Sequence, residues 1–257
     1  ASSKKRILMI ETQAFRTQAR TIDHLGREQI ADCPTAVSEL WKNAYDAYAR
    51  NVSLHIFDDA EPVAAIFDDG HGMSYEEFLD RWLVIGTDSK FEKEVSDEKD
   101  RDGLKKRSKQ GQKGIGRLSS ANLGPLLLVV SKRKGESFVA ALLDWRIFEN
   151  PYLVLSDIQV PVTRFEKKSE LGQLLPGLFD SLTDNLWGSP AEPERAKRLK
   201  VAWETYDRVM QESDPEIEAP SNRIAGTIIN AVFEDKHFEP RSVWKGEKEH
   251  GTALIVS

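Results

Sequence analysis

The amino-acid sequence predicts a mixed α/β fold, because helical and strand patterns alternate along its 257 residues. An amphipathic helical pattern covers residues 29–50, two short alternating runs lie within residues 52–67, and two apolar runs of strand length lie within residues 126–143. Hydrophobic residues make up 40% and charged residues 30%, which is the composition of a globular protein. The length allows one large domain or two small ones.

The overall charge excludes some classes of function. The formal net charge of −6 disfavours a general nucleic-acid binder, although a local basic patch stays open. No apolar run approaches the ~20 residues of a membrane span, so we expect no membrane partner. The only cysteine, Cys33, cannot form an internal disulfide, so we expect a reducing compartment and a cytoplasmic location. We expect Cys33 to be a buried or half-buried residue at a helix start.

The first elements follow from periodicity and turn residues. Pro34 is a plausible start signal for the helix predicted over 29–50. The runs 52–57 and 63–67, separated by a polar turn, predict a hairpin. A capping-box spacing between Ser74 and Glu77 opens a helix that extends to about Val84.

A charged segment separates these elements from the central strands. Residues 87–110 are rich in Asp, Glu, Lys and Arg, and loops of this length in a compact domain are usually functional or disordered. A helix is predicted over 115–123. The strands predicted at 126–130 and 138–143 are joined by a Lys-Gly turn, and residues 152–162 add an extended piece.

The last third of the chain changes character. Residues 171–187 and 195–210 read as helices, so we interpret 168–222 as a helical insertion. Strand character returns at 226–233 and again at 251–256. Because the chain stops inside this last strand, we expect it to be the N-terminal fragment of a longer protein.

Three blocks of residues suggest chemistry, and the first lies on the first long helix. Glu39 and Asn43 are four residues apart and therefore project together. An amide oxygen suits a magnesium ion that otherwise keeps waters and phosphates. A carboxylate one turn earlier can orient or deprotonate water. Asp46 could fix the helix end or a water. Alone, the pair reads most simply as a solvated helix face.

The second block follows a strand. Asp68 ends the second strand of the hairpin, where a carboxylate can accept a hydrogen bond from an exocyclic amine such as that of adenine. Gly70 and Gly72 permit positive φ and close backbone approach, and Met73 offers a soft apolar surface. The simpler alternative is an ordinary Asp-Gly turn.

The third block is the glycine-rich stretch 111–116. Its spacing lets successive backbone N–H groups face phosphates ahead of a helix N-terminus. It lacks the ending of a Walker A loop and the preceding strand of a Rossmann fingerprint. Its candidate binding residues are Gly111, Lys113, Gly114, Ile115 and Gly116.

The order of the three blocks resembles the GHKL ATPases, which include type II DNA topoisomerases, Hsp90-like chaperones, MutL and MORC proteins and sensor histidine kinases. The stretch 39–47, ending in Ala47, is similar to Glu-x-x-x-Asn-x-x-Asp-Ala, and 68–73 is similar to Asp-x-Gly-x-Gly with a trailing Met. A fourth motif, Gly-Thr before a strand, fits Gly251-Thr252, with Gly226-Thr227 as a rival. Residues 85–90 are similar to the lid entrance of Hsp90-like and MORC-like members.

The resemblance implies a Bergerat fold, a two-layer sandwich with a mixed, mainly antiparallel sheet covered by helices. It implies ATP and Mg²⁺ as ligands beneath a lid at about 87–110. Asp68 would read adenine with help from Thr252, Asn43 would hold magnesium, and Glu39 would be the general base. The glycine block would hold phosphates.

Glu39 favours hydrolysis over phosphotransfer, because sensor kinases usually lack this carboxylate. Two alternatives stay open: a nucleotide-gated binding module with negligible turnover, and a histidine-kinase-type phosphotransferase. The leading interpretation is an ATPase acting as a conformational switch, weak in the isolated fragment. Its expected partners are a following domain or effector and a second copy in an ATP-dependent homodimer, whereas direct nucleic-acid binding by this domain is not expected.

Overall fold

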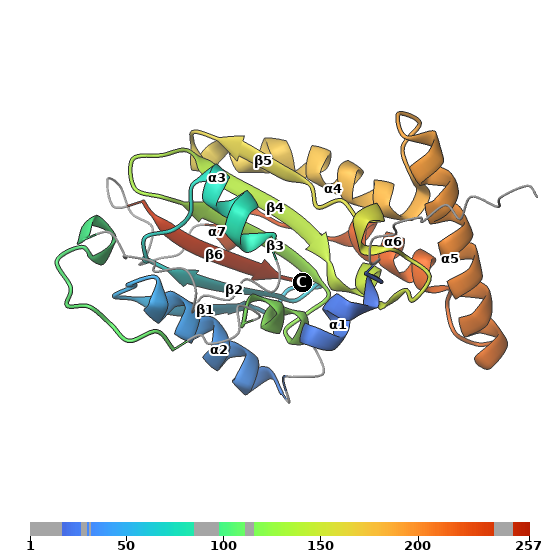
Figure 1. The fold of residues 1–257 in the computed structure, drawn as a ribbon, viewed down its shortest axis with the longest axis horizontal. Coiled ribbons are helices and arrows are strands. Elements are labelled where there is room, and N and C mark those ends of the chain that lie inside the picture. The colour runs from blue at the N-terminus through green and yellow to red at the C-terminus, as the bar shows by residue number, and fades with distance from the viewer. Residues whose placement is uncertain (1–16, 27–29, 31, 85–97, 111–115, 239–248) are drawn as a thin grey trace, which may run out of the picture.

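The computed structural model describes residues 17–26, 30, 32–84, 98–110, 116–238 and 249–257 (Figure 1). Within these residues, six strands form one sheet in the order β1-β2-β6-β3-β4-β5, and each neighbouring pair is antiparallel. The strands are β1 (Val52–Phe57), β2 (Val63–Asp68), β3 (Leu126–Lys132), β4 (Phe138–Asp144), β5 (Val162–Phe165) and β6 (Gly251–Val256). The predicted α/β fold class, a mainly antiparallel sheet under helices, is confirmed.

The last strand lies in the middle of the sheet. β6 pairs with β2 on one side and with β3 on the other, so three segments far apart in sequence lie side by side. The registers place Thr252 opposite both Asp68 and Ser131. Side chains directly opposite in a sheet share a face, so these three polar side chains gather at one end of the three central strands.

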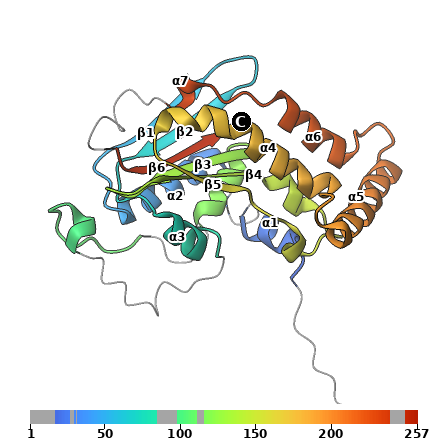
Figure 2. The same cartoon turned by 90° about the horizontal axis from the view of Figure 1, so that it is seen from above.

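Helices cover both faces of the sheet (Figure 2). One layer contains α1 (Arg20–Gly26), α2 (Cys33–Asp46) and α3 (Tyr75–Glu77), and the other contains α4 (Leu171–Trp187), α6 (Pro220–Asn230) and α7 (Asp235–Phe238). The long helix α5 (Pro193–Ser213) packs against α4 and α6 at one end of the molecule. No helix in the described part of the chain is both long enough and apolar enough to span a membrane.

The core lies between these layers. Every residue of β4 is buried, as is every residue of β3 except Lys132, which explains why both strands are nearly continuous apolar runs. Helix α4 packs a leucine stripe into this core. Its buried leucines are Leu171, Leu175, Leu178, Leu182 and Leu186. The segment predicted as an insertion therefore covers the second face of the sheet.

Several predicted elements are confirmed. The hairpin β1–β2 has the predicted position, and α4 has the predicted bounds. The capping box is present, because Ser74 Oγ accepts from Glu77 N at 3.1 Å while Glu77 Oε2 accepts from Ser74 N at 3.0 Å. The helix that it opens continues after α3 as a π-helix, η2 (Phe78–Trp82).

Three local predictions were wrong. Residues 226–230 are not a strand but the end of α6, because Ile224 and Ile228 are buried one turn apart on the same helix face. Within 152–162 there is a short 3-10 helix at Leu155–Asp157, and β5 begins only at Val162. Cys33 begins a helix as expected, but it is exposed.

The glycine-rich stretch leads into a 3-10 helix, η4 (Gly116–Asn122), where a helix was predicted. The predicted lid is only partly within the described residues. Its part at 98–110 begins with a 3-10 helix, η3 (Glu98–Arg101), whereas 87–97 lie outside the described residues.

Candidate functional site

Helix α2 carries the first candidate block. Its N-cap is Asp32, whose side chain accepts from Thr35 N at 2.8 Å, which stabilises the first turn. Its buried face is formed by Ala36, Leu40 and Ala44 at four-residue spacing. Glu39 and Asn43 each precede a buried residue by one position, so both project from the same flank of the helix. The predicted pairing of these two side chains on one face is thus realised.

The two side chains have different surroundings. The Glu39 side chain is 31% exposed, and its Oε1 forms an ion pair of 2.5 Å with Lys42 Nζ. Asn43 is exposed and faces Gly116, the first residue of η4. A Cβ at Gly116 would lie 3.1 Å from Asn43 Oδ1 and 3.3 Å from its Nδ2. Glycine at position 116 therefore lets the start of η4 lie close to Asn43 on α2.

The second block begins at the end of β2. Asp68 Oδ1 accepts from Gly70 N at 2.8 Å, and Asp68 lies opposite Thr252 in β6. Burial raises the pKa of Asp68 to about 7, although hydrogen bonds from the backbone N–H groups of Gly70 and Thr252 act in the opposite direction and the neighbouring charge of Asp69 adds to the increase. The carboxyl group thus changes its ionisation near neutral pH.

The loop after Asp68 packs onto the end of α2. His71 N donates to Ala47 O at 2.9 Å. A Cβ at Gly70 would lie 2.8 Å from the same carbonyl oxygen. Gly70 does not have a positive φ, so the predicted backbone freedom is not used there, and glycine is needed for the close approach alone. Gly72 does adopt a positive φ of +65°, and its Cβ would lie 1.9 Å from Lys132 O.

A buried serine links the second block to β6 and was missed by the sequence interpretation. Ser131 Oγ accepts from Met73 N at 3.0 Å and lies 2.9 Å from Thr252 Oγ1 and 3.1 Å from Gly251 O. The sequence signal is a single hydroxyl after the apolar run 126–130. Such a residue on a buried strand has to find hydrogen-bond partners.

Asp69 has a different role from its neighbour. Its Oδ1 accepts from Arg50 N at 2.7 Å and from Asn51 N at 2.8 Å, and its Oδ2 accepts from Asn51 Nδ2 at 2.8 Å. These bonds connect the loop after β2 to the loop before β1. Of the two adjacent aspartates, Asp69 therefore connects two loops, while Asp68 is half-buried beside β6.

The rival Gly-Thr pair lies elsewhere. Thr227 is in α6, and its Oγ1 donates to Arg223 O at 3.1 Å, as a helical threonine does. Gly251, in contrast, opens β6 with a φ of +127°, and a Cβ there would lie 2.0 Å from Asp68 O. Of the two pairs, Gly251-Thr252 is the one that contacts Asp68.

Residues from the predicted lid contact the end of α2. Arg107 Nη1 donates to Tyr45 O at 2.9 Å and to Ala49 O at 3.0 Å, and its guanidinium lies 4.5 Å from the Tyr45 ring centre. Asp46 Oδ1 accepts from Gln110 N at 2.8 Å, so this carboxylate binds the segment 98–110. Arg107 was not singled out from the sequence. The remaining predicted phosphate-binding residues, Gly111, Lys113, Gly114 and Ile115, lie outside the described residues.

Comparison with known protein families gives a match to the part of the chain that contains these motifs. The model of the family described as histidine kinase-, DNA gyrase B-, and HSP90-like ATPase matches residues 32–170, which is more than half of the chain. The chain belongs to this ATPase family. The match includes the first three blocks and ends before the helices α4 to α7. No curated protein matches the chain.

The metal-binding capacity of the described side chains decides which kind of ion the candidate site could hold. The described residues contain no group of three or more His, Cys, Asp or Glu side chains that could hold an ion. A site with an exposed Asn43 amide as its protein ligand fits a hard cation that is bound mainly by phosphates and water. It does not fit a metal held by a protein cage, such as structural zinc.

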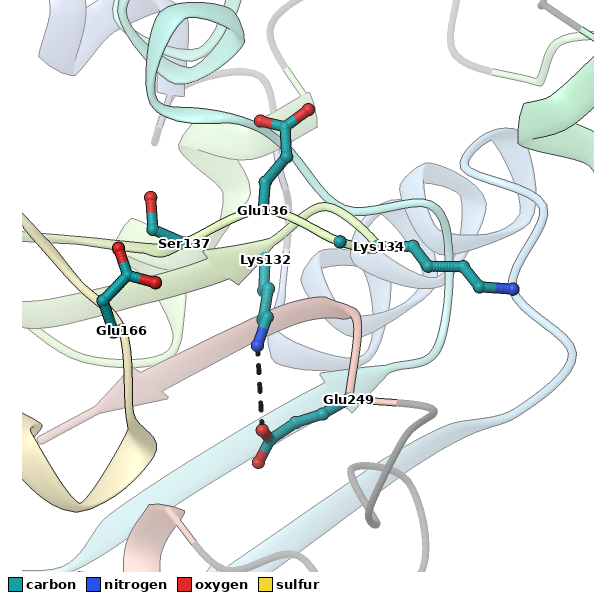
Figure 3. A pocket seen from close by; sticks show the side chains of 7 residues that line it. Lys132, Lys134, Glu136, Ser137, Glu166 and Glu249 are labelled. Atoms are coloured by element: carbon teal, nitrogen blue, oxygen red, sulfur yellow. Dashed lines mark ion pairs between the residues drawn. The ribbon is translucent and has the colours of Figure 1, made fainter.

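A separate pocket lies outside the candidate site. Figure 3 shows its lining, which comes from the end of β3, the β3–β4 turn, Glu166 after β5 and Glu249 before β6. Lys132 points toward Glu249, with 3.9 Å between Nζ and Oε2. No predicted site residue lines this pocket, and its lysine and glutamate charges largely balance each other.

Proposed function

We propose that this chain binds ATP with Mg²⁺ and hydrolyses it, and that the nucleotide state switches its coupling to a following domain or partner. One observation carries the proposal. The end of α2 contacts both candidate halves of a nucleotide site: Ala47 contacts the Asp68 loop, and Asn43 contacts Gly116. The residues proposed to bind adenine and those proposed to bind phosphate therefore both contact one helix.

Asp68 would recognise the adenine amine. Its carboxylate ends a buried strand beside Thr252 and can accept a hydrogen bond when ionised. The hydroxyls of Ser131 and Thr252 lie 2.9 Å apart and could bind a water next to the ring. Met73 is half-buried close by, and its N–H is already bound by Ser131, which leaves the thioether to contact the ring.

Asn43 and Gly116 would lie at the phosphates. Asn43 offers an exposed amide oxygen for the magnesium of Mg·ATP, and such an ion supplies neutralisation of phosphate charge when bound. Gly116 begins a helix whose first N–H groups have no helical partners and can donate to phosphate oxygens. Gly111, Lys113, Gly114 and Ile115 are proposed for the same role from their motif.

Glu39 would act as the general base. Its Oε2 can accept a proton from a water that attacks the terminal phosphorus, while the bond to the bridging oxygen breaks and ADP leaves with that electron pair. Its position one turn before Asn43 supports this role. The contacts of Arg107 and Gln110 with α2 support a coupling of the 98–110 segment to the same helix. We propose that the nucleotide state controls the binding of a partner and the formation of an ATP-dependent homodimer.

The test is the turnover of Glu39→Gln in the longest natural form of the protein. Loss of a general base should lower kcat by about 100-fold or more while ATP still binds. Glu76→Gln is the matched control, because Glu76 is an exposed glutamate on α3 and should leave turnover unchanged. Undiminished hydrolysis by Glu39→Gln would refute the assigned base, and absent ATP binding by the wild type would refute the function.

A second candidate function is a nucleotide-gated binding module with negligible turnover. The Glu39–Lys42 ion pair of 2.5 Å favours it, because the ammonium group occupies one oxygen of the carboxylate that would have to meet the attacking water. Lys42→Met separates the two candidates. If the ion pair restrains the base, this variant should hydrolyse ATP faster than the wild type; unchanged or lower turnover would show that the pair does not hold turnover down.

A further inference from the structure

Arg117 bonds to the end of another helix. It is the second residue of η4, directly after Gly116. Its Nη1 donates to the backbone carbonyls of Arg81 and Trp82, which end the π-helix η2. One side chain therefore joins the helix that follows the glycine block to the helix that precedes the charged segment.

The chemistry of this contact suits an arginine. The last carbonyls of a helix have no intrahelical partners and carry a negative partial charge, so a cation beside them is favourable. A guanidinium has five N–H donors in a rigid plane, whereas a lysine offers a compact ammonium group. Arg117 is half-buried and so partly removed from water, and this burial lowers its pKa from the very high ordinary value. The carbonyls replace hydration that it has lost.

Gly116 is held from two directions. Arg117 connects η4 to η2, and Ser119 Oγ donates to Gly116 O at 2.5 Å while lying 3.4 Å from Ala36 O of α2. Gly116 itself lies against Asn43, because its Cβ position is 3.1 Å from the Asn43 Oδ1. The helix η4 is anchored by the buried Leu118, and the side-chain bonds of Arg117 and Ser119 add to this packing at the end where Gly116 lies.

We propose that Arg117 is a positioning residue, which holds Gly116 beside Asn43 by bonding to the carbonyls of Arg81 and Trp82. This inference rests on the proposed ATP function, because Gly116 and Asn43 are assigned to the phosphate side of the site. Arg117 acts on the nucleotide through Gly116 and not by contact. Its loss should therefore weaken ATP binding and leave the adenine side intact.

The experiment compares Arg117→Ala, Arg117→Lys and Arg81→Ala in the full chain. Arg81→Ala is the matched control, because it removes an arginine side chain that is 53% exposed and paired with Glu77, yet keeps the backbone carbonyl that Arg117 uses. Losing charged hydrogen bonds of this kind should weaken ATP binding roughly 10- to 100-fold in Arg117→Ala, with Arg117→Lys in between and Arg81→Ala unchanged. Calorimetry with a non-hydrolysable ATP analogue measures these affinities.

Two further readouts separate positioning from a general loss of structure. Adenosine binding, followed by ligand-observed NMR, should be unchanged in Arg117→Ala, whereas a loss of structure would weaken adenosine and ATP together. Added guanidinium ion at millimolar concentration should restore ATP binding to Arg117→Ala and not change the wild type, because the ion can occupy the vacated place at the two carbonyls. Failure of both results would overturn the proposal.

Amide hydrogen exchange of the nucleotide-free protein distinguishes positioning by Arg117 from direct contact between Arg117 and the phosphates. Positioning requires faster exchange at residues 117–123 in Arg117→Ala before any nucleotide is added, whereas direct contact predicts unchanged exchange. If Arg117→Ala does not fold, the Arg117→Lys series decides by the same comparisons. Wild-type protein that binds no ATP would refute the proposed function, whereas equal ATP binding by wild type and both Arg117 variants would refute only this inference.

Discussion

The two ends of the candidate site are constructed differently. At the Asp68 end, the polar groups lie on three adjacent strands, and the pairings of Asp68, Thr252 and Ser131 are fixed by strand register. At the Asn43 end, one exposed helical side chain meets Gly116, which is held by side-chain bonds from Arg117 and Ser119. At the second end a single substitution can remove a bond near Gly116, whereas at the first end the positions of the polar groups follow from the pairing of the strands.

This difference teaches where stability and function are coupled. Binding groups that are positioned by strand register depend on the same hydrogen bonds and packing that hold the core. Substitutions that disturb these strands should therefore lower the free energy of unfolding. Groups that depend on single side chains can be altered with less effect on the fold. Substitutions at the Asp68 end should therefore alter stability and binding together unless they are isosteric, and substitutions at the Asn43 end should alter binding first.

The largest expected effect is on stability at the Asp68 end. Gly72→Ala combines a φ of +65° with a Cβ that would lie 1.9 Å from Lys132 O, so it should lower the free energy of unfolding by at least about 3 kcal/mol. Gly135→Ala is the control, because Gly135 has a φ of +80° with nothing within 4 Å and should cost only about 1–2 kcal/mol. Urea unfolding measures both. Equal losses would show that the close contact does not matter.

The next effect separates two adjacent aspartates. Asp68→Asn should weaken ATP binding roughly 10- to 100-fold, because it removes a charged acceptor for the adenine amine. It should not destabilise the nucleotide-free protein above pH 7, since an amide avoids the cost of burying charge. Asp69→Asn should instead destabilise the nucleotide-free protein and leave ATP binding unchanged, because Asp69 accepts hydrogen bonds from Arg50 and Asn51. Calorimetry measures ATP binding and thermal unfolding measures stability. Equal behaviour of the two variants in both measurements would contradict the assignment.

The sequence predicted where the strand-end motif at Asp68 lies along the chain, and it did not predict which strands would lie beside it. Alternating and apolar runs predict strands, and a motif at a strand end then has few places to lie. The central position of β6 was outside the reach of periodicity, because pairing with β2 and β3 is a long-range choice. Ser131 was missed for the same reason, since its partners are 58 to 121 residues away in the chain.

The helix–strand error at 226–230 has a related cause. Thr227, Ile228 and Ile229 form a short β-branched run that has strand propensity. In the structure, α6 packs Ile224 and Ile228 into the core at helical spacing and leaves Ile229 81% exposed. Tertiary burial overrode local propensity. Arg107 and Arg117 could not be selected among the 36 lysines and arginines, because nothing local marks a guanidinium that bonds to distant carbonyls.

The third prediction uses pH to sharpen the role of Asp68. Its pKa of about 7 is raised above the usual 3.8, so the folded protein holds this proton longer than the unfolded chain does. The residue therefore favours folding at low pH, and this contribution is lost as pH rises from about 4 to 7. Adenine recognition needs the ionised form, so adenosine affinity should fall roughly 10-fold from pH 8 to pH 6. Adenosine carries no phosphate that titrates in this range, and Asp68→Asn should remove the dependence.

The smallest expected effect tests whether the three strands act as one unit. Ser131→Ala leaves Met73 N–H and the Thr252 hydroxyl without the buried oxygen that they share, so it should lower the free energy of unfolding by about 1–2 kcal/mol. Ser137→Ala, in the half-exposed region before β4, should stay within about 0.5 kcal/mol of the wild type. If Ser131→Ala also weakens adenosine binding while Arg117→Ala does not, the two ends are independent; a loss of adenosine binding in both variants would show that the division between them is wrong.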